Sequence, residues 1–244
     1  MAFFSTLKKM RSGKIPSCSA VIAAGGCSQR MNGEDKLFAE IHGAPVLAHT
    51  LTAFQNCGYI DEIVIVTRGE CIQSVSEICK RFGISKASKV IVGGATRLES
   101  VMNGLFAVSK KAELVAIHDG ARPCVRQDVI RQAVETAAKY HAAAPAVPVS
   151  STIKKAQRGI VINTVDRDDL FEIQTPQVFT ADLIKAALTN ANNKSIDITD
   201  DCKAVELLGA SVHMTEGTQS NIKITTPEDL VIAEAVLQGA GSRE

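Results

Sequence analysis

The sequence predicts one α/β domain built on a doubly wound, mostly parallel β-sheet with helices on both faces. In the first 140 residues, short β-branched runs alternate with longer segments of helical periodicity, as in chains whose helices cross between parallel strands. Several of the strand-like runs are continuously apolar, which is typical of strands covered on both faces. The chain has 244 residues, of which 45% are apolar, enough to bury a substantial core.

The first half of the chain supplies the parallel strands and the helices that connect them. Gly83 is expected to stop the second helix, and Thr96 with Glu99 forms a capping-box pattern that starts the third. Predicted strands cover 19–24, 63–67, 89–92 and 114–117, and predicted helices cover 45–56, 70–82, 96–108 and 127–140.

The second half contains a predicted β-hairpin arm, at about 149–168, that projects from the sheet. After a strand-like run at 146–149, the runs 151–154 and 160–163 are separated by a turn that ends at Gly159. A two-stranded hairpin is marginal alone, and a partner subunit is one surface on which it could lie. The other predicted elements are helices at 181–190 and 201–208, a strand at 211–214 and a helix that starts at Thr226-Pro227.

Residues 1–17 are predicted to be a flexible basic leader ahead of a single domain at 18–240. The leader lacks the apolar stretch of a signal peptide, and no segment reaches the ~20 apolar residues of a membrane helix. The 27 Lys+Arg against 26 Asp+Glu give no basic field that would indicate nucleic acid. The seven scattered cysteines form no C-x-x-C pair, which predicts reduced thiols and a cytoplasmic protein.

Polar and glycine-rich segments follow three of the predicted strands, where ligands bind in open α/β sheets. Gly25 and Gly26 bring backbone N–H groups together, and Arg30 and Lys36 add positive charge, which suits a phosphate group. An ordinary strand-to-helix turn would carry similar glycines. The second segment, 93–100, joins two glycines to a capped helix, where an anion or a base edge could bind.

The third segment, His118 to Pro123, places Asp119 at the end of a buried strand and before a glycine. A carboxylate there can hold Mg²⁺, which prefers one or two carboxylates together with substrate phosphate oxygens. The alternative is a surface ion pair between Asp119 and Arg122. Because no G-x-S-x-G motif and no zinc spacing occurs, metal-assisted chemistry on phosphate is the reaction class that is left.

Seven ordered segments resemble the 2-C-methyl-D-erythritol 4-phosphate cytidylyltransferase family, over about residues 19–237. The fold that the resemblance implies is a Rossmann-like sheet of the nucleotidyltransferase type. The matching segments are 23–38, 93–97, 118–123, 164–167, 174–179, 199–201 and 221–229.

The resemblance implies a Mg²⁺-dependent enzyme that joins CTP to 2-C-methyl-D-erythritol 4-phosphate, and a homodimer in which the arm reaches the partner's site. It assigns the triphosphate to Ala23, Ala24, Gly25, Gly26, Arg30, Lys36 and Lys223, and cytosine and ribose to Gly94, Ala95 and Ser100. It assigns Mg²⁺ and nucleotide contacts to Asp119, and the second substrate to Asp119, Arg122, Thr152, Arg167 and Thr175. Arg30, Lys36 and Lys223 are the implied catalytic residues.

The chain departs from the family pattern at two places in its first loop. Cys27, Ser28 and Gln29 make the loop one residue longer and remove its second spaced glycine, and Asp35 replaces the usual proline. A ribitol 5-phosphate cytidylyltransferase is the nearest alternative, and a catalytically silent nucleotide-binding protein is an alternative of another class. An NAD-dependent oxidoreductase is disfavoured because the loop is not G-x-G-x-x-G.

Overall fold

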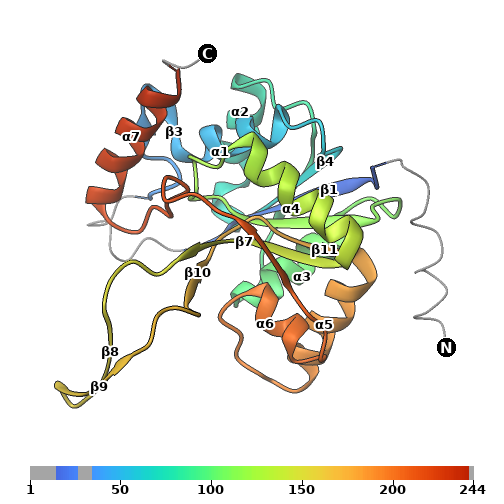
Figure 1. Ribbon diagram of the computed structural model, residues 1–244. Helices are drawn as coiled ribbons and strands as arrows, with labels where there is room; N and C mark the ends of the chain where they lie inside the picture. Colours follow the sequence, from blue (N-terminus) through green and yellow to red (C-terminus); the bar gives the residue numbers. More distant parts are fainter. Residues whose placement is uncertain (1–14, 27–34, 242–244) are drawn as a thin grey trace, which may run out of the picture.

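A computed structural model of the chain describes residues 15–26 and 35–241, and its centre is one mixed, mostly parallel sheet (Figure 1). The strand order is β10-β7-β11-β6-β1-β4-β5, and β12 pairs with the other edge of β7. Strands β1, β4, β5 and β6 are parallel, as predicted, whereas β11 is antiparallel to β6 and β7. The strands are β1 (Cys18–Ala24), β4 (Glu62–Thr67), β5 (Ala87–Val92), β6 (Leu114–Asp119), β7 (Ala142–Pro148), β10 (Phe171–Ile173), β11 (Gln177–Thr180) and β12 (His213–Glu216).

Helices cover both faces of the sheet, which confirms the doubly wound prediction. Alternate residues of β1 point to opposite faces, so that Ile22 packs with α1 and α4 while Val21 packs with α3 and α5. The helices are α1 (Val46–Gln55), α2 (Ile72–Arg81), α3 (Arg97–Ala107), α4 (Gln127–Tyr140), α5 (Ala181–Asn193), α6 (Asp201–Glu206) and α7 (Pro227–Gly241), with a 3₁₀ turn at η2 (Gly69–Cys71). A short hairpin, β2 (Glu40–Ile41) and β3 (Ala44–Pro45), precedes α1.

The helix ends follow local signals in the sequence. Thr96 caps α3 by accepting from the backbone N–H of Glu99, and the Glu99 side chain completes the capping box. Gly83 adopts a φ of 63° just after α2, and Gly209 a φ of 77° after α6, both in the left-handed region that glycine favours. Within the described residues, no helix is both long and apolar enough to cross a membrane.

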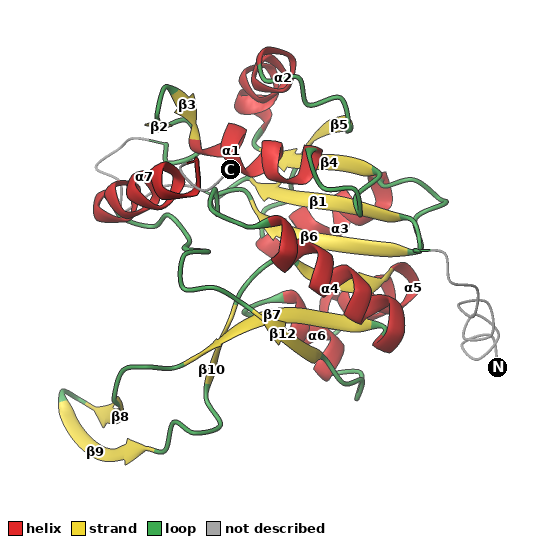
Figure 2. Ribbon diagram, turned by 45° about the horizontal axis from the view of Figure 1, so that its top comes forward, coloured by secondary structure: helices red, strands yellow, loops and turns green. Residues whose placement is uncertain are grey.

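The predicted arm is present as a separate hairpin of β8 (Ile153–Gln157) and β9 (Ile160–Val165). Arg158 and Gly159 form its turn, with φ values of 51° and 80°, the pattern of a tight two-residue hairpin turn. Figure 2 shows the arm extending away from the sheet beyond β7 and β10. Its strands expose apolar side chains, since Ile160 is 72% and Ile162 is 56% exposed.

Candidate active site

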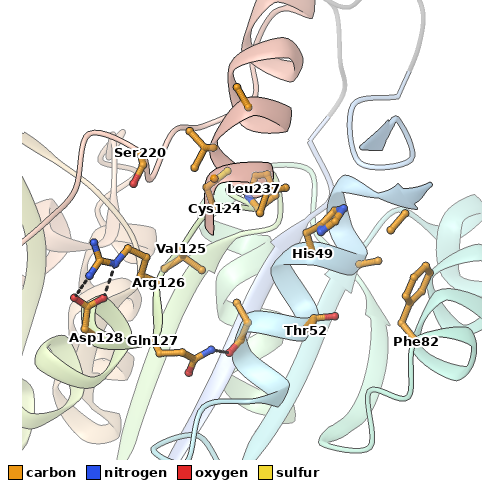
Figure 3. Close-up of a pocket in the computed structure, with 17 residues that line it drawn as sticks. His49, Thr52, Phe82, Cys124, Val125, Arg126, Gln127, Asp128, Ser220 and Leu237 are labelled. Carbon is orange, nitrogen blue, oxygen red and sulfur yellow. Dashed lines mark hydrogen bonds and ion pairs between the residues drawn. The ribbon is translucent and has the colours of Figure 1, made fainter. Parts of the chain in front are cut away.

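A crevice of about 1000 Å³ lies between α1, the start of α4 and α7 (Figure 3). Its lining mixes apolar side chains with polar ones such as His49, and both oxygens of Asp128 bind the Arg126 guanidinium at 3.0 and 2.7 Å. None of the predicted site residues within the described ranges lines it. The crevice therefore contains none of the side chains that the sequence links to phosphate or metal chemistry, and it is not the candidate site.

The predicted polar segments meet at the carboxyl edge of the parallel strands. In the strand register, Ala23 lies opposite Asp119, Ala24 opposite Thr67, and Thr67 opposite Val92. The loops that follow β1, β4, β5 and β6 therefore leave the sheet side by side, at the edge where open α/β sheets bind ligands.

The first loop offers an open backbone at Gly26. Gly26 is exposed, and a Cβ there would meet nothing within 4 Å. The preceding strand is tied in place because the Thr67 hydroxyl donates to the Ala24 carbonyl at 3.0 Å. Arg30 and the rest of 27–34 lie outside the described residues.

Lys36 follows the first loop and is held in a turn beside β4. The Asp35 carboxylate accepts from the Leu37 amide at 3.1 Å, and its backbone carbonyl accepts from the Phe38 amide at 2.9 Å. The same carboxylate forms an ion pair with Arg68, which follows the last residue of β4. The backbone of Lys36 is therefore fixed at the edge where β1 and β4 end.

The second loop is shaped by contacts within the chain. Gly94 has no room for a side chain, because a Cβ there would lie 2.2 Å from Glu99 Cβ. Its amide donates to Ser100 Oγ at 3.1 Å, and the Ala95 amide donates to the Glu99 carboxylate at 2.7 Å. Ser100 thus has a structural partner, and its ligand role stays a prediction.

Arg97 binds a buried acid that the sequence did not link to it. Its guanidinium contacts both oxygens of Asp201, at 3.0 and 2.7 Å, and the Asp201 side chain is fully buried. Burial alone lowers the pKa of Arg97, but the Asp201 carboxylate outweighs that effect and raises it. The pair ties the second loop to the start of α6.

Asp119 is a carboxylate surrounded by positively charged side chains at this edge. Lys223 Nζ lies 2.8 Å and Arg122 Nε 3.6 Å from Asp119 Oδ2. Burial raises the pKa of Asp119, but Lys223, Arg97 and Arg122 together lower it to about 2, so that the carboxylate is ionised. The predicted alternative of a surface pair with Arg122 is too simple, because both side chains are only 12% exposed and Lys223 is the nearer partner.

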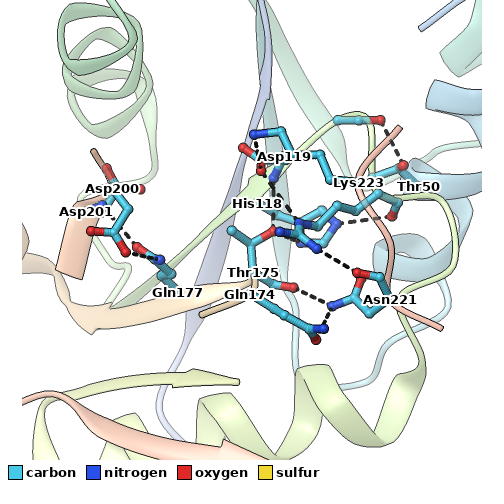
Figure 4. A network of polar contacts seen from close by, with 12 residues as sticks. Thr50, His118, Asp119, Gln174, Thr175, Gln177, Asp200, Asp201, Asn221 and Lys223 are labelled. Carbon is cyan, nitrogen blue, oxygen red and sulfur yellow. Dashed lines mark hydrogen bonds and ion pairs between the residues drawn. The ribbon is translucent and has the colours of Figure 1, made fainter. Parts of the chain in front are cut away.

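A hydrogen-bonded chain lies beneath Asp119 (Figure 4). The Arg122 carbonyl can only accept, so that His118 Nε2, at 3.3 Å, carries the proton and Nδ1 accepts from the Thr175 hydroxyl at 2.9 Å. The Thr175 oxygen in turn accepts from the Asp119 amide at 3.2 Å. Burial lowers the pKa of His118 to about 3 and keeps it neutral. Because the Thr175 hydroxyl donates its one hydrogen bond to His118, its oxygen can only accept from a ligand.

Thr152 and Arg167 are not brought to this edge within one chain. Thr152 immediately precedes β8, Arg167 follows β9, and both are exposed. Arg167 donates to the Ser150 carbonyl at the base of the arm. The hairpin between these two residues extends away from the sheet (Figures 1 and 2).

A metal ion at this edge would depend on Asp119 and on ligand oxygens. Among the described residues, no three His, Cys, Asp or Glu side chains gather into a metal-binding group. Asp119 alone supplies an ionised, nearly buried carboxylate at a strand end. This donor set fits Mg²⁺, which binds through one or two carboxylates and keeps waters or phosphate oxygens as its other ligands.

Several residues of the site carried no signal in the sequence. Asn221 is fully buried, and Gln174 and Gln177 are 6% and 2% exposed, yet all three bond across the cluster. Asn221 Nδ2 donates to the Thr175 carbonyl at 2.9 Å, and Gln177 Oε1 accepts from the Asp201 amide at 3.0 Å. Gln174, Gln177 and Asn221 lie in segments that match the family, but residue type alone gives no partner for a buried amide.

Comparison with known proteins points to one family. The model of the 2-C-methyl-D-erythritol 4-phosphate cytidylyltransferases matches residues 18–239. A curated protein of that name from Halalkalibacterium halodurans is 47% identical to this chain, over 90% of this chain and 96% of the relative. One from Caldanaerobacter subterraneus is 45% identical, over 90% of this chain and 98% of the relative.

Solved structures agree with these sequence relatives. The 4-diphosphocytidyl-2C-methyl-D-erythritol synthase of Anaerococcus prevotii superposes with a TM-score of 0.80 at 32% identity, over 91% of this chain and 96% of that one. The 2-C-methyl-D-erythritol 4-phosphate cytidylyltransferase of Thermus thermophilus gives a TM-score of 0.76 at 32% identity, over 90% and 98% of the two chains.

Proposed function

The chain belongs to the 2-C-methyl-D-erythritol 4-phosphate cytidylyltransferase family, and we propose that its reaction takes place at the edge around Asp119. The enzyme transfers the cytidylyl group of CTP to 2-C-methyl-D-erythritol 4-phosphate and releases pyrophosphate. The observation that carries the proposed location is the convergence of Lys223, Arg122 and Asp119 beside the glycine loops of β1 and β5.

The nucleophile is a phosphate oxygen of the second substrate. It attacks the α-phosphorus of CTP, a new P–O–P bond forms, and the bond between the α-phosphorus and the oxygen bridging to the β-phosphate breaks. Pyrophosphate carries away the electron pair of that bond. A phosphate monoester has a second pKa of about 6, so that it is mostly dianionic at neutral pH and needs no general base. The neutral, internally bonded His118 is consistent with this.

The difficulty of the reaction is the approach of one anion to another. We assign Arg30, Lys36 and Lys223 to the phosphates of CTP, where they offset the charge that gathers in the transition state. We assign the backbone from Ala23 to Gly26 to the triphosphate as well, which the exposed position of Gly26 at the end of β1 supports.

Cytosine and ribose are assigned to the second loop, through Gly94, Ala95 and Ser100. Gly94 is exposed and cannot carry a side chain, so that a base can approach its backbone closely. The Arg97–Asp201 pair and the capping box hold this loop in shape before the nucleotide arrives.

Mg²⁺ is the proposed cofactor, with Asp119 as its ligand. When bound, it would act as a Lewis acid on the phosphate oxygens of CTP. The low pKa of Asp119 supports this role, because the carboxylate is ionised throughout the neutral range. In the structure, the same carboxylate forms ion pairs with Lys223 and Arg122.

We propose a homodimer in which the arm of one subunit completes the site of the other. Methylerythritol phosphate would contact Asp119, Arg122 and Thr175 of one subunit and Thr152 and Arg167 of its partner. The arm supports this, because it extends away from the sheet of its own subunit and Thr152 and Arg167, which flank its two strands, are exposed. A guanidinium such as Arg167 matches a phosphate with two parallel hydrogen bonds.

A cytoplasmic location is proposed from the cysteines. The six that the structure describes are free thiols, and five of them are buried. Reduced, unpaired cysteines of this kind are typical of proteins in a reducing compartment.

The substrate is tested by pyrophosphate release with CTP and Mg²⁺, with either methylerythritol 4-phosphate or ribitol 5-phosphate as acceptor. We expect turnover with the former alone. Turnover with ribitol 5-phosphate alone would keep the chemistry and overturn the substrate. A folded protein that is silent with both acceptors yet binds CTP would be a nucleotide-binding protein without this activity.

A further inference from the structure

Gln174 lies where the chain returns from the arm to the sheet. It directly follows β10, and its amide donates to the Pro145 carbonyl of β7 at 2.7 Å. Its side chain points into the polar cluster around Asn221 and Thr175 (Figure 4). Gln174 is 6% exposed, so that its carboxamide must find its partners inside the protein.

The carboxamide of Gln174 fastens the loop that carries Lys223. Its Nε2 donates to the Thr218 carbonyl at 2.8 Å, and its Oε1 accepts from Asn221 Nδ2 at 3.1 Å and from the Thr218 amide at 3.3 Å. The loop comes so close that a Cβ on Gly217 would lie 2.8 Å from Gln174 Oε1. The backbone at Gly217 therefore packs closely against the Gln174 carboxamide.

The same loop is then attached to the strand end that carries Asp119. The Asn221 carbonyl accepts from Arg122 Nη1 at 2.6 Å, and the Ile224 amide donates to the Ala121 carbonyl at 2.8 Å. Between these two anchors, Lys223 extends its half-exposed side chain to Asp119, 2.8 Å away. The backbone anchors on both sides of Lys223 therefore determine where its long side chain begins.

We propose that Gln174 is a positioning residue for cytidylyl transfer, which acts by holding the 217–223 loop so that Lys223 lies at the α-phosphate site. The proposal rests on the function proposed above in one respect, the role of Lys223 as a phosphate-binding cation. A displacement of about 1 Å at such a group can cost about 100-fold in rate. Because Gln174 also ends the return strand of the arm, the arm and Lys223 share one anchor.

The chain contains a matched control three residues along. Gln177 is also a buried glutamine of the same segment, at 2% exposure, but it bonds to the start of α6 through Asp200 and Asp201. Its Nε2 donates to Asp200 Oδ2 at 2.8 Å, on the side of the second loop. Gln177 is therefore expected to act independently of Lys223.

The test is a double-mutant cycle on kcat and KM, with Gln174→Met and Lys223→Ala made singly and together. Methionine keeps the volume of the side chain and removes all three hydrogen bonds. We expect Gln174→Met to lower kcat about 10–100-fold, as partners of site residues do elsewhere. In the Lys223→Ala background the same change should have an effect of less than about twofold, because the group that it positions is absent.

A second cycle with Gln177→Met and Lys223→Ala is expected to be multiplicative. If the Gln174 and Lys223 effects also multiply, or if Gln174→Met leaves kcat unchanged, the proposal is overturned. Where Gln174→Met fails to fold, Gln174→Glu replaces it, since it keeps the shape and turns the donor to Thr218 into an acceptor.

Hydrogen exchange separates this proposal from the reaction itself. In Gln174→Met, the amides of Gly217, Thr218 and Ile224 should exchange faster while those of α4 are unchanged, whether or not the protein turns over its substrates. Unchanged exchange in this loop would overturn the positioning role. An inactive wild-type protein whose Gln174→Met variant shows the expected exchange change would instead count against the proposed function and not against the positioning role of Gln174.

Discussion

His118 and Asp119 are neighbours in β6 that respond differently to burial. Burial lowers the pKa of His118 to about 3, and no residue in the described part of the chain forms an ion pair with it, so that the imidazole is neutral. Asp119 keeps its charge because Lys223, Arg97 and Arg122 outweigh the cost of burial. His118 therefore contributes hydrogen bonds beneath the site, and Asp119 contributes a negative charge.

The buried His118 predicts a loss of stability in mild acid. The unfolded chain binds a proton on this side chain below about pH 6.5, whereas the native protein binds it only near pH 3, so that the free energy of unfolding falls as the pH falls through this window. From pH 7 to pH 4 this amounts to about 3 kcal/mol.

Urea unfolding at both pH values, for wild type and His118→Gln, measures this effect. In His118→Gln, the slope of the free energy of unfolding against pH should be smaller by the contribution of about one bound proton. Equal slopes would show that His118 is not held neutral. Asp119 contributes outside this window, because its lowered pKa removes stability only as the pH falls from about 4 towards 2.

Lys36→Ala is expected to lower kcat about 100–1000-fold, equivalent to about 2.7–4 kcal/mol, as does the loss of one charge-stabilising donor elsewhere. The fold should persist, because Asp35 and Arg68 continue to hold the turn. Steady-state kinetics with thermal unfolding measure both quantities. Lys110→Ala is the matched control, since Lys110 is exposed and precedes β6 at the opposite edge of the sheet. Normal turnover in a folded Lys36→Ala protein would remove Lys36 from the mechanism.

At the scale of elements, the start of α3 is where backbone geometry and nucleotide binding meet. Gly94→Ala would place a Cβ 2.2 Å from Glu99 Cβ, so that the loop or the first turn of α3 must move. We expect a loss of about 1–3 kcal/mol in the free energy of unfolding and weaker binding of CTP. Urea unfolding and titration calorimetry measure the two effects.

Gly58→Ala is the control for Gly94→Ala, because a Cβ on Gly58 meets nothing within 4 Å. Its effect on stability should stay within about 0.5 kcal/mol. If Gly94→Ala binds CTP as tightly as wild type does, the second loop does not contact the nucleotide as proposed.

Elements with strong periodicity were predictable from the sequence, and elements without it were not. The helix 127–140 agrees with α4 at both ends, because an apolar stripe runs along it and His141 ends it with a φ of 75°. Strand β7 begins at Ala142 and not at the predicted 146, since its first residues are three alanines and a proline, which have low β-propensity. The short strands β10 and β11 were missed.

The candidate site was predictable from the sequence only for residues that directly follow a parallel strand. The glycine loops and Asp119 follow strands, and parallel strands bring their ends together. Contacts between residues far apart in the sequence could not be predicted. Examples are Asp119 with Lys223, and Gln174 with Asn221, which is 47 residues away. Family resemblance alone brought Lys223 to the phosphates.

At the scale of the whole molecule, the arm is the feature that a single chain does not explain. Ile160, Val161 and Ile162 are 72%, 57% and 56% exposed, on a hairpin that extends away from the sheet (Figure 2). Exposed apolar surface of this kind marks an interaction site. The arm therefore agrees with a dimer in which it lies on the partner.

Replacing Ile160, Val161 and Ile162 by serine should convert a dimeric wild type into a monomer and reduce turnover, because Arg167 would no longer reach the partner's site. Sedimentation velocity measures the mass, and the pyrophosphate assay measures turnover. Phe106→Ser is the control, since Phe106 is 70% exposed on α3, outside the arm. A wild type that is monomeric and active would contradict the shared site.

The most direct test of the account is pyrophosphate release by wild type and Asp119→Asn, with CTP, methylerythritol 4-phosphate and Mg²⁺. Asparagine keeps the shape of the side chain and removes the charge that faces Lys223 and Arg122. We predict release by the wild type only when both substrates are present, and a loss of at least about 100-fold in a folded Asp119→Asn protein. Turnover at the wild-type rate by Asp119→Asn would contradict the claim that cytidylyl transfer takes place at this edge of the sheet.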